Sequence, residues 1–441
     1  MTAKAREDDG RARGRRLRRK VGRTEQGHWR PVKERADPLA ILQESNAERL
    51  PHLVPLKTGR MALSPFGFFR GAAPVMAADL ARRPYTGLLV QLCGDAHVQN
   101  IGAFATPEGR LVFDLNDFDE TIQGPWEWDV ARLAASVVLA GREAGNGNRL
   151  CVEAVRMLTR SYRESMDRFS EMGLLELARY EVHRHTKDGP VRLALGKAER
   201  ATGAHAVEKL TLPTKSGRRF HDRPPLLCHV PGRTARAVIA SLAGYRETLG
   251  ADRRLVVEGY RPVDVAFKVV GTGSVGTRDY VVLLVGRHAD DYFLLQVKEE
   301  LPSCYGRHLP EAPPYRHQGQ RVAEGQHRMQ TYSDPFLGWT SLEGRDYLVR
   351  QLCDHKAKVE LEDMEGAALV EFALVSGEIL AKGHARTGDA AAIAGYCGKS
   401  AKLDKALAAF AVAYADQTEH DHERLLQAIK LGRVKAAPPE V

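Results

Sequence analysis

The stretch of sequence that decides the fold is "QLCGDAHVQNIGAF", residues 91–104. Asp95 stands two positions before His97 and five before Asn100, at the end of the apolar run "TGLLVQLC". Short apolar runs bounded by glycines and acids are typical of buried strands. The pattern therefore predicts a strand that ends in a polar turn, and the turn carries side chains suited to chemistry.

A second cluster, "LVFDLNDFDET" at residues 111–121, follows closely and ends in acids. Phosphoryl transfer needs a carboxylate that orients or deprotonates the acceptor hydroxyl, together with oxygen ligands for Mg²⁺. Because Mg²⁺ keeps several of its waters, one Asn and one or two Asp are enough to hold it. The two clusters supply Asp95 as the predicted base, with Asn100 and Asp117 as predicted metal ligands.

A glycine-rich stretch, "VVGTGSVGTRDYVVLL" at residues 269–284, contains G-x-G-x-x-G as Gly271, Gly273 and Gly276, with Ser274 among them. In a dinucleotide-binding fold these glycines would open a helix. Here a β-branched run follows, which favours a strand. Strand, glycines and strand form the hairpin that covers nucleotide phosphates in protein kinases. An ordinary glycine-rich hairpin without a ligand is the alternative.

A lysine follows the glycines in the apolar run "YFLLQVKEE". Lys298 lies 25 residues after Gly273 (298 − 273), on the next predicted strand. A lysine that contacts the α- and β-phosphates needs an acidic partner to hold it in position. We expect Glu324, on the following predicted helix, to be that partner, and Glu299 and Glu300 to point elsewhere or into solvent.

The runs "GDAHVQN", "NDFDE" and "GPWEWDVARLA" resemble the aminoglycoside phosphotransferase and choline kinase branch of the protein-kinase-like fold. That branch carries a G-D-x-H-x-x-N catalytic loop, a D-F-D or D-F-G metal motif and a W-D-L-A helix. The resemblance implies that Asp129 braces the catalytic loop and that His97 shapes it. Over about residues 60–425 the chain also resembles the bacterial family DUF2252, through these runs and through "DPFLGWT", "YLVRQL" and "YADQTEHDH".

The metal aspartate is ambiguous in the sequence. "VFDLN" matches the motif through Asp114, whereas "NDFDE" matches it through Asp117. The 12-residue gap from Asp117 to Asp129 (129 − 117) suits the kinase-like branch better. We therefore favour Asp117, with Asp119 as an additional candidate ligand.

The predicted fold class is α+β: a bilobed, protein-kinase-like fold with a small antiparallel-sheet lobe and a mostly helical large lobe. Asp95 precedes Gly271 by 176 residues (271 − 95), the reverse of the usual kinase order, so we expect a circular permutation. Permutation is tolerated where chain ends lie close together on the surface. The expected parts are a basic disordered tail (1–36), the first part of the large lobe (37–257), the small nucleotide lobe (258–365) and C-terminal helices completing the large lobe (366–441).

The net charge of +9 is concentrated at the N-terminus. Residues 1–36 hold 13 Lys and Arg against 5 Asp and Glu, which leaves +1 for the rest (9 − 8). Such a basic tail is compatible with contact to RNA, anionic lipid or an acidic partner. The sequence shows no apolar run long enough to span a membrane and no secretory signal, and its six cysteines are widely scattered, so we expect a cytoplasmic protein.

The leading functional hypothesis is an ATP- and Mg²⁺-dependent phosphotransferase acting on a hydroxyl of a small molecule or protein. One alternative keeps the nucleotide site but transfers AMP, or only binds nucleotide as a regulator. Another is an RNA-binding protein acting through the Arg-rich tail. The acceptor is not readable from the sequence. The basic segment 183–225, with His185, Lys209 and Arg218, could form a wall for an anionic acceptor or be a solvated insertion.

Overall fold

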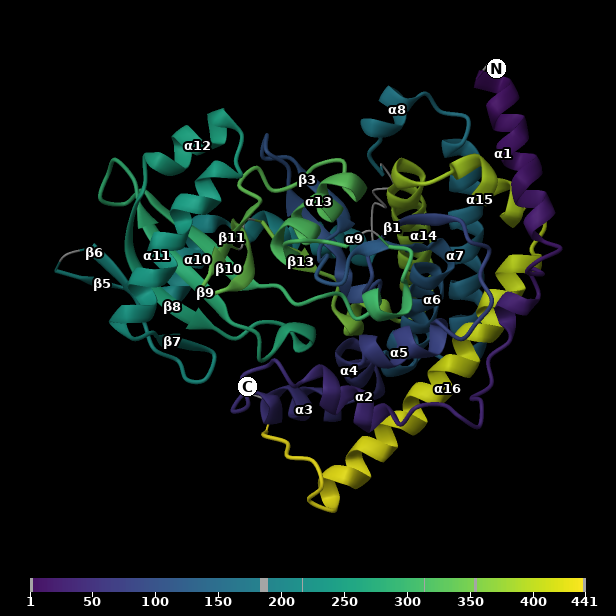
Figure 1. The fold of residues 1–441 in the computed structure, drawn as a ribbon, viewed down its shortest axis with the longest axis horizontal. Helices are drawn as coiled ribbons and strands as arrows, with labels where there is room; N and C mark the ends of the chain where they lie inside the picture. The colour runs from purple at the N-terminus through teal and green to yellow at the C-terminus, as the bar shows by residue number, and fades with distance from the viewer. Residues whose placement is uncertain (1–2, 183–188, 216, 313, 353–354, 439–441) are drawn as a thin grey trace.

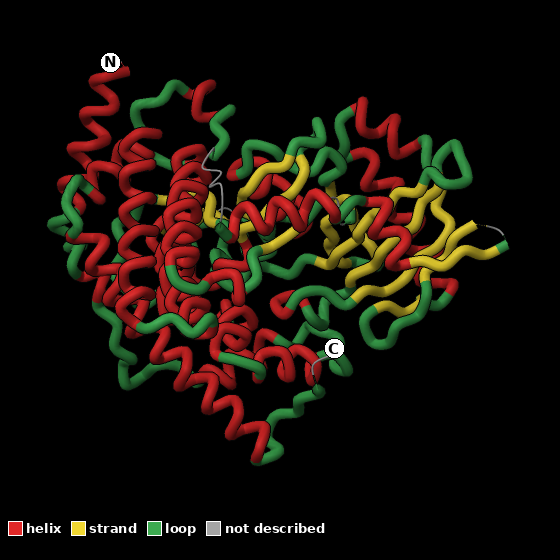
Figure 2. Tube along the Cα trace, turned by 180° about the vertical axis from the view of Figure 1, so that it is seen from behind, coloured by secondary structure: helices red, strands yellow, loops and turns green. Residues whose placement is uncertain are grey.

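The computed structural model describes residues 3–182, 189–215, 217–312, 314–352 and 355–438. Most helices gather on one side of the molecule, and the largest sheet lies on the other (Figure 1; Figure 2). We call residues 203–352 the sheet region, and the described residues on either side of it the helical region. The predicted α+β class is confirmed.

The helical region is built mainly of helices that pack around two small antiparallel sheets. One sheet pairs β1 with β4, and the other has the order β13-β2-β3. The helices are α1 (Ala3–Leu17), α2 (Pro38–Ser45), α3 (Val54–Ala62), α4 (Pro65–Gly71), α5 (Ala73–Leu80), α6 (Trp126–Glu143), α7 (Asn148–Phe169), α8 (Leu174–Ala178), α9 (Pro190–Arg200), α14 (Ala367–Thr387), α15 (Ala390–Cys397) and α16 (Lys402–Lys430). The strands are β1 (Leu89–Leu92), β2 (Ile101–Ala105), β3 (Leu111–Leu115), β4 (Ile122–Pro125) and β13 (Ala357–Lys358).

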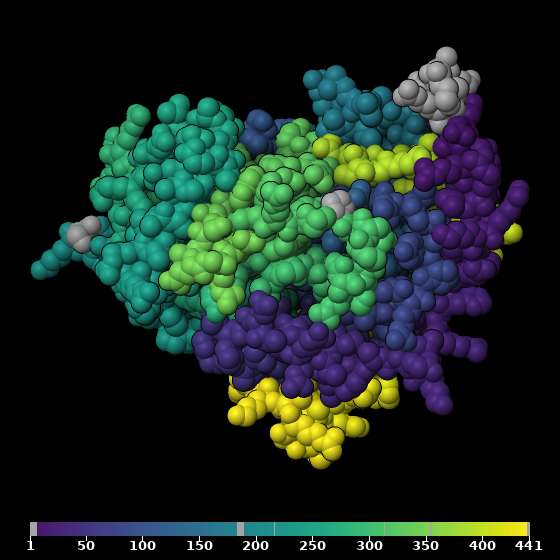
Figure 3. Space-filling model, in the orientation of Figure 1, coloured from purple at the N-terminus to yellow at the C-terminus, as the bar shows by residue number. Residues whose placement is uncertain are grey.

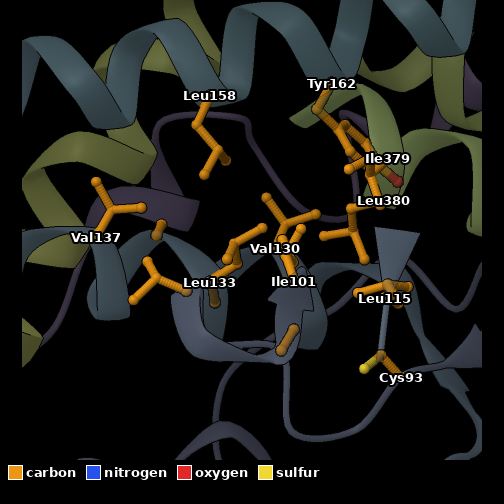
Figure 4. Packing of buried hydrophobic residues seen from close by; sticks show 14 of the residues in the cluster. Cys93, Ile101, Leu115, Val130, Leu133, Val137, Leu158, Tyr162, Ile379 and Leu380 are labelled. Atoms are coloured by element: carbon orange, nitrogen blue, oxygen red, sulfur yellow. The ribbon is translucent and has the colours of Figure 1, made fainter. Parts of the chain in front are cut away.

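Helix α6 lies at the centre of the helical region and is buried from Trp126 to Gly141. Figure 4 shows its Val130 and Leu133 in one core with Leu158 of α7 and Leu380 of α14. Burying one such aliphatic side chain contributes roughly 1.5–3 kcal/mol. The strands that carry the polar turns are therefore anchored beneath a tightly packed group of helices.

The expectation of a disordered tail at residues 1–36 is wrong for the described part, because α1 packs along α15. Gly14 approaches α15 so closely that a Cβ there would overlap the carbonyl oxygen of Ala392. Arg18 Nε and Arg23 Nη1 donate to backbone carbonyls at the C-terminal end of α15, at 2.9 and 2.8 Å. A helix leaves its last carbonyls without internal partners and carries negative partial charge there. Basic side chains thus order this segment.

The sheet region contains a six-stranded antiparallel sheet in the order β11-β12-β10-β9-β8-β7. Its strands are β7 (Leu227–His229), β8 (Arg261–Lys268), β9 (Asp279–Val285), β10 (Tyr292–Glu299), β11 (Gly338–Leu342) and β12 (Arg345–Gln351). A separate hairpin and several helices flank the sheet: β5 (Thr211–Thr214), β6 (Gly217–Phe220), α10 (Gly203–Leu210), α11 (Gly232–Glu247), α12 (Ala251–Glu258) and α13 (Gln318–Met329).

Strand β9 shows why this sheet needs cover on both faces. Tyr280, Val282 and Leu284 pack in one cluster with residues of α11 and α12. Val281 and Leu283 face the other way and pack with residues of α10 and β6. Side chains alternate between the faces of a strand, so an apolar run of this kind must be buried on both sides.

The sheet region differs at both ends from the predicted small lobe, 258–365. The sheet region begins at residue 203, because α10, α11, α12 and the strands between them supply the apolar cover. It ends at residue 352, because β13 pairs with β2 of the helical region. The rest of the predicted first part, up to residue 200, is helical with short strands, and α14 to α16 give the predicted helices within 366–441.

No helix in the described ranges is long and apolar enough to cross a membrane. The cysteines in these ranges are free thiols: Cys93, Cys151, Cys228, Cys304 and Cys397. Cys353 lies outside the described residues.

Candidate functional site

One face of α6 holds the polar turn that follows β1. Asp129 accepts the N–H of Cys93 at 2.6 Å and the N–H of Gly94 at 3.0 Å. Ser136 Oγ accepts a further N–H of the same turn at 3.1 Å. Residues three to four apart on a helix share a face, so Asp129, Arg132 and Ser136 reach the turn together. Asp129 therefore occupies the bracing position that the resemblance implied.

Asp95 lies in this turn with one oxygen paired and the other available. Its Oδ1 accepts from Arg132 Nε at 2.6 Å and lies 2.5 Å from Arg132 Nη2. Its Oδ2 lies 3.8 Å from His97 Nε2. Burial lowers the pKa of His97 to about 3, although the charge of Asp95 opposes the shift, so the ring is neutral near pH 7. A neutral, buried His97 fits the predicted loop-shaping role.

Asn100 ties the turn to the acidic loop that follows β3. Its Nδ2 donates to the backbone carbonyl of Asp95 at 2.9 Å and to that of Asp117 at 3.1 Å. The amide nitrogen is thus used for structure. The amide oxygen accepts no hydrogen bond from the described residues and is the atom that can face a cation.

Asp114 does not belong to this group. It is buried in β3, and its carboxylate contacts Lys382 Nζ of α14. Asp117 lies beyond the end of β3, in the same loop as Asp119, and its backbone carbonyl accepts from Asn100 Nδ2. The structure therefore separates the two readings of the sequence motif: Asp117 reaches the site and Asp114 does not.

Lys298 of β10 is buried against the acidic loop. Its Nζ contacts Asp119 Oδ2 and lies 3.9 Å from Asp117 Oδ1 and 3.9 Å from Glu300 Oε1. Burial raises the pKa of Asp117, and the charge of Asp119 adds to the shift. Burial acts in the same direction on Asp119, but the charge of Lys298, together with hydrogen bonds that include those from Lys298 and Ser274, holds the pKa of Asp119 below its usual range. Glu300, expected to point away, is instead buried beside the lysine.

The expected ion pair between Lys298 and Glu324 is not formed in the structure. Glu324 accepts from Gln320 Nε2 at 2.7 Å and pairs with Arg328 at 3.1 Å on the same helix. The rotation of α13 explains this. Buried Arg321 donates to three backbone carbonyls of the acidic loop and of the segment after β10, at 2.6–2.8 Å. Position 321, and not position 324, therefore faces the site.

The glycine stretch Gly271–Gly276 connects the antiparallel strands β8 and β9, as predicted, and opens no α-helix. Ser274 Oγ donates to Asp119 Oδ2 at 2.7 Å. A Cβ at Gly273 would lie 4.0 Å from Asp95 Oδ2. The loop therefore lies close to both acidic clusters, although they are distant in sequence.

These groups line one polar cavity of ≈ 190 Å³. It adjoins a larger cavity of ≈ 1040 Å³, lined by α2, α5 and residues 301–315. Figure 3 shows a hollow on this face, where dark purple atoms of the N-terminal segments meet green atoms of the sheet region. The predicted residues that line the polar cavity are Asp95, His97, Asn100, Asp117, Asp119, Gly271, Gly273, Ser274 and Lys298. Gly276, Asp114 and Glu324 do not line it.

The basic segment 183–225 does not form a wall of these cavities. None of its described residues, Lys209 and Arg218 included, lines either one. His185 lies outside the described residues.

Sequence reasoning missed several charged residues of the polar cavity and its supports. Arg132 carried a signal, because it stands one helical turn after Asp129. The others stand in no motif and come to the site only through the fold: Arg49, Lys57, Arg70, Glu300, Arg321 and Arg350.

The oxygens of the site fit a hard cation. Asp117 Oδ1 and Asp119 Oδ1 are buried and receive no hydrogen bond from the described residues. With the amide oxygen of Asn100 they give three hard donors, a set suited to Mg²⁺, which retains waters. Within the described ranges no three His, Cys, Asp or Glu side chains converge as a complete metal cage.

The fold and site define an α+β protein in which a glycine loop, a buried lysine and two acidic clusters meet in one polar cavity. Residues 49–428 match the family described as "Uncharacterized protein conserved in bacteria (DUF2252)", and the chain belongs to this family. Comparison with curated proteins and with solved structures finds no match.

Proposed function

We propose that this protein is an ATP- and Mg²⁺-dependent phosphotransferase that transfers the γ-phosphoryl group to a hydroxyl. One observation carries the proposal: a glycine loop between antiparallel strands and Lys298 on the next strand meet Asp95, Asn100 and Asp117 in a single cavity. Kinase-like phosphoryl transfer uses this set of parts, each with a separate role.

The glycine loop and Lys298 would bind the phosphates of the nucleotide. The loop offers backbone N–H groups without side chains in the way at Gly271 and Gly273, and Lys298 offers a buried positive charge. Asp117 and Asp119 would hold Mg²⁺ with Asn100. A metal ion bound there neutralises charge on the transferred phosphoryl group.

Asp95 would position the acceptor hydroxyl and accept its proton at Oδ2. Arg132 fixes the other oxygen, so the carboxylate is held in one orientation. As the acceptor oxygen bonds to the γ-phosphorus, the bond from that phosphorus to the β–γ bridging oxygen breaks and ADP leaves. A positioned base of this kind contributes about 10²–10⁴-fold to the rate.

The chain order belongs to the same proposal. The glycine loop at residues 271–276 follows the Asp95 turn in sequence but lies against it in space. A circular permutation of a protein-kinase-like fold would account for this order, with the sheet region as the nucleotide lobe and α14 to α16 completing the large lobe.

Thermal stability with Mg²⁺ and ATP tests the binding half of the proposal. A ligand that binds the folded state raises its melting temperature. We expect a rise for the wild type and for Asp114→Ala, measured against each protein's own baseline, and none for Asp117→Ala. Loss of the rise in Asp114→Ala with retention in Asp117→Ala would overturn the metal assignment.

Product analysis tests the reaction half. The wild type is incubated with ATP, Mg²⁺ and a metabolite extract, and the products are analysed by mass spectrometry. We expect ADP and a phosphate adduct that are absent with Asp95→Asn. Pyrophosphate and an AMP adduct would instead show nucleotidyl transfer.

A further inference from the structure

One wall of the polar cavity is more positive than the proposed reaction explains. Residues 46–74 contribute Arg49, Lys57 and Arg70 to the lining. None of the three has a role in the proposed transfer, for which Lys298 and the glycine loop already supply the phosphate contacts.

Among the described residues these three cations form no ion pair, and Glu120, which lines the same cavity, accepts the N–H of Cys304 instead. Lys57 Nζ donates to Asn46 Oδ1 at 3.0 Å, and Arg49 Nη1 donates to the carbonyl of Val275 at 2.7 Å. The buried Nε atoms of Arg49 and Arg70 have no hydrogen-bond partner among the described residues. Within those residues no carboxylate lies within 4.0 Å of a charged nitrogen of the three.

The paired cations of the site show the contrast. Lys298 contacts Asp119, and Arg132 contacts Asp95. Arg350, on the sheet side, resembles the wall in having a neutral partner, because its Nε donates to Gln296 Oε1 at 2.8 Å. A buried charge without a counter-ion is strongly unfavourable unless something compensates it. Burial, and then Arg49, hold the pKa of Lys57 well below its usual range. A bound anion would compensate the positive charge of these three residues.

The wall lies between the predicted base and the glycine loop: Arg49 Nη1 donates to Val275 of that loop, and Arg70 Nη2 lies 3.8 Å from the Cβ position of Gly271. The three cations come from the helical region, whereas the glycine loop and Lys298 come from the sheet region. The carbonyl oxygen of Arg70 lies 3.7 Å from the Cβ position of Gly273, and Asp95 Oδ2 lies 4.0 Å from the same point. Burial lowers the pKa of Arg70, and Asp95 is the carboxylate that acts most strongly against this shift. The wall thus adjoins the predicted base.

We infer that Arg49, Lys57 and Arg70 form an anion subsite for an acidic group of the acceptor, so that the acceptor is a phosphorylated or otherwise doubly charged hydroxyl compound. The anion subsite is inferred from the cavity alone. The identification of its ligand as the acceptor rests on the proposed function. Three cations suit the dianionic phosphate group better than a single carboxylate, and guanidinium groups bind phosphate through paired N–H donors.

Inorganic phosphate is the probe, and isothermal titration is the measurement. The full chain is first saturated with Mg²⁺ and β,γ-imido ATP, which fills the three phosphate positions of the nucleotide, and phosphate is then added. We expect phosphate to bind the wild type, and Arg70→Gln and Lys57→Met to weaken it tenfold or more. Their affinity for the ATP analogue should change less than about threefold.

Two further variants keep the test interpretable. Arg307→Gln makes the same change of charge in the larger cavity, at an exposed arginine paired with Glu44 at 3.0 Å, and should bind phosphate as the wild type does. Arg70→Lys keeps the charge and should retain most of the affinity. If Arg70→Gln does not fold, phosphate binding to Lys57→Met and to Arg70→Lys still tests the anion subsite.

The outcomes separate this inference from the proposed function. Equal phosphate affinity in all variants, or no phosphate binding to the loaded wild type, overturns the inference and leaves the phosphotransferase standing. Parallel loss of phosphate and analogue affinity also overturns it, because the cations would then serve the nucleotide. Phosphate binding that depends on Arg70 in a protein that binds no nucleotide supports the subsite and overturns the phosphotransferase.

Discussion

Lys382, in the core of the helical region, and Lys57, in the wall of the polar cavity, are each 2% exposed but have different partners. Lys382 contacts the carboxylate of Asp114. Lys57 has the neutral amide of Asn46. A buried lysine with a carboxylate is part of the folded structure, whereas one without a carboxylate is better explained by a ligand. The difference teaches that burial alone does not reveal a functional charge, but burial together with the partner does.

The largest effect is expected at the paired lysine. Lys382→Met leaves Asp114 buried without its cation, and we expect the free energy of unfolding to fall by about 3–5 kcal/mol. Urea denaturation at pH 7 measures it. Lys382→Met combined with Asp114→Asn should recover much of the loss. If the free energy of unfolding of Lys382→Met lies within about 1 kcal/mol of the wild-type value, the ion pair with Asp114 does not have the structural role that the comparison gives it.

The next effect is on catalysis. Asp95→Asn should reduce ATP turnover by about 10²-fold or more, because the proposed base is lost. The rise in melting temperature with Mg²⁺ and ATP should remain. Turnover is compared where both proteins are folded, since the variant leaves Arg132 without its carboxylate. Unchanged turnover would remove Asp95 from the reaction.

Asp279 extends the comparison to a buried carboxyl group that has no ion pair with any described residue. It is fully buried, its Oδ2 accepts from Gln296 at 2.6 Å, and burial raises its pKa to about 7. The folded protein then holds a proton that the unfolded chain releases near pH 4, so stability falls as pH rises from about 4 to 7. Asp279→Asn removes this slope. Its advantage over the wild type should grow by about 2 kcal/mol between pH 5 and pH 8, measured by urea denaturation. A constant difference would contradict the assignment.

The smallest effect is expected at the unpaired lysine. Without ligand, Lys57→Met should unfold within about 1 kcal/mol of the wild type, or be more stable, because an uncompensated buried charge is removed. The same denaturation experiment as for Lys382→Met gives the direct contrast. A loss above about 3 kcal/mol would show that Lys57 has a structural partner after all.

The sequence predicted those parts of the fold that local pattern determines. Apolar runs located β1, β9 and β10, and the glycine stretch located the turn between β8 and β9. It did not predict the order of α1, because that helix packs on α15, and Arg18 directly after it binds a carbonyl of α15 nearly 380 residues away. The sequence also did not indicate where the sheet region begins, because the helices that cover an apolar sheet can come from any part of the chain.

The site shows the same division. Asp95, Asn100, Asp117, Asp119 and Lys298 were predicted by motif and do meet in the cavity. The Glu324 partner was not found, because sequence distance does not give the rotation of a helix, and Arg321 sets that rotation here. The cationic wall of Arg49, Lys57 and Arg70 had no motif at all, so only the packing of α3 and α4 on the glycine loop reveals it.

Gly14 allows α1 to pack closely on α15. This packing determines how much free positive charge the molecule presents as a polyelectrolyte. Residues 1–36 carry an excess of eight positive charges (13 − 5), nearly all of the protein's net +9. While α1 is docked, several of these charges neutralise carbonyl dipoles and carboxylates of the protein itself, Arg11 with Asp167 among them. A methyl group at Gly14 would overlap α15, and we expect it to release the helix. One small substitution would thus turn a structural element into a free polycation, with the strong salt dependence and indiscriminate affinity for nucleic acids that free polycations have.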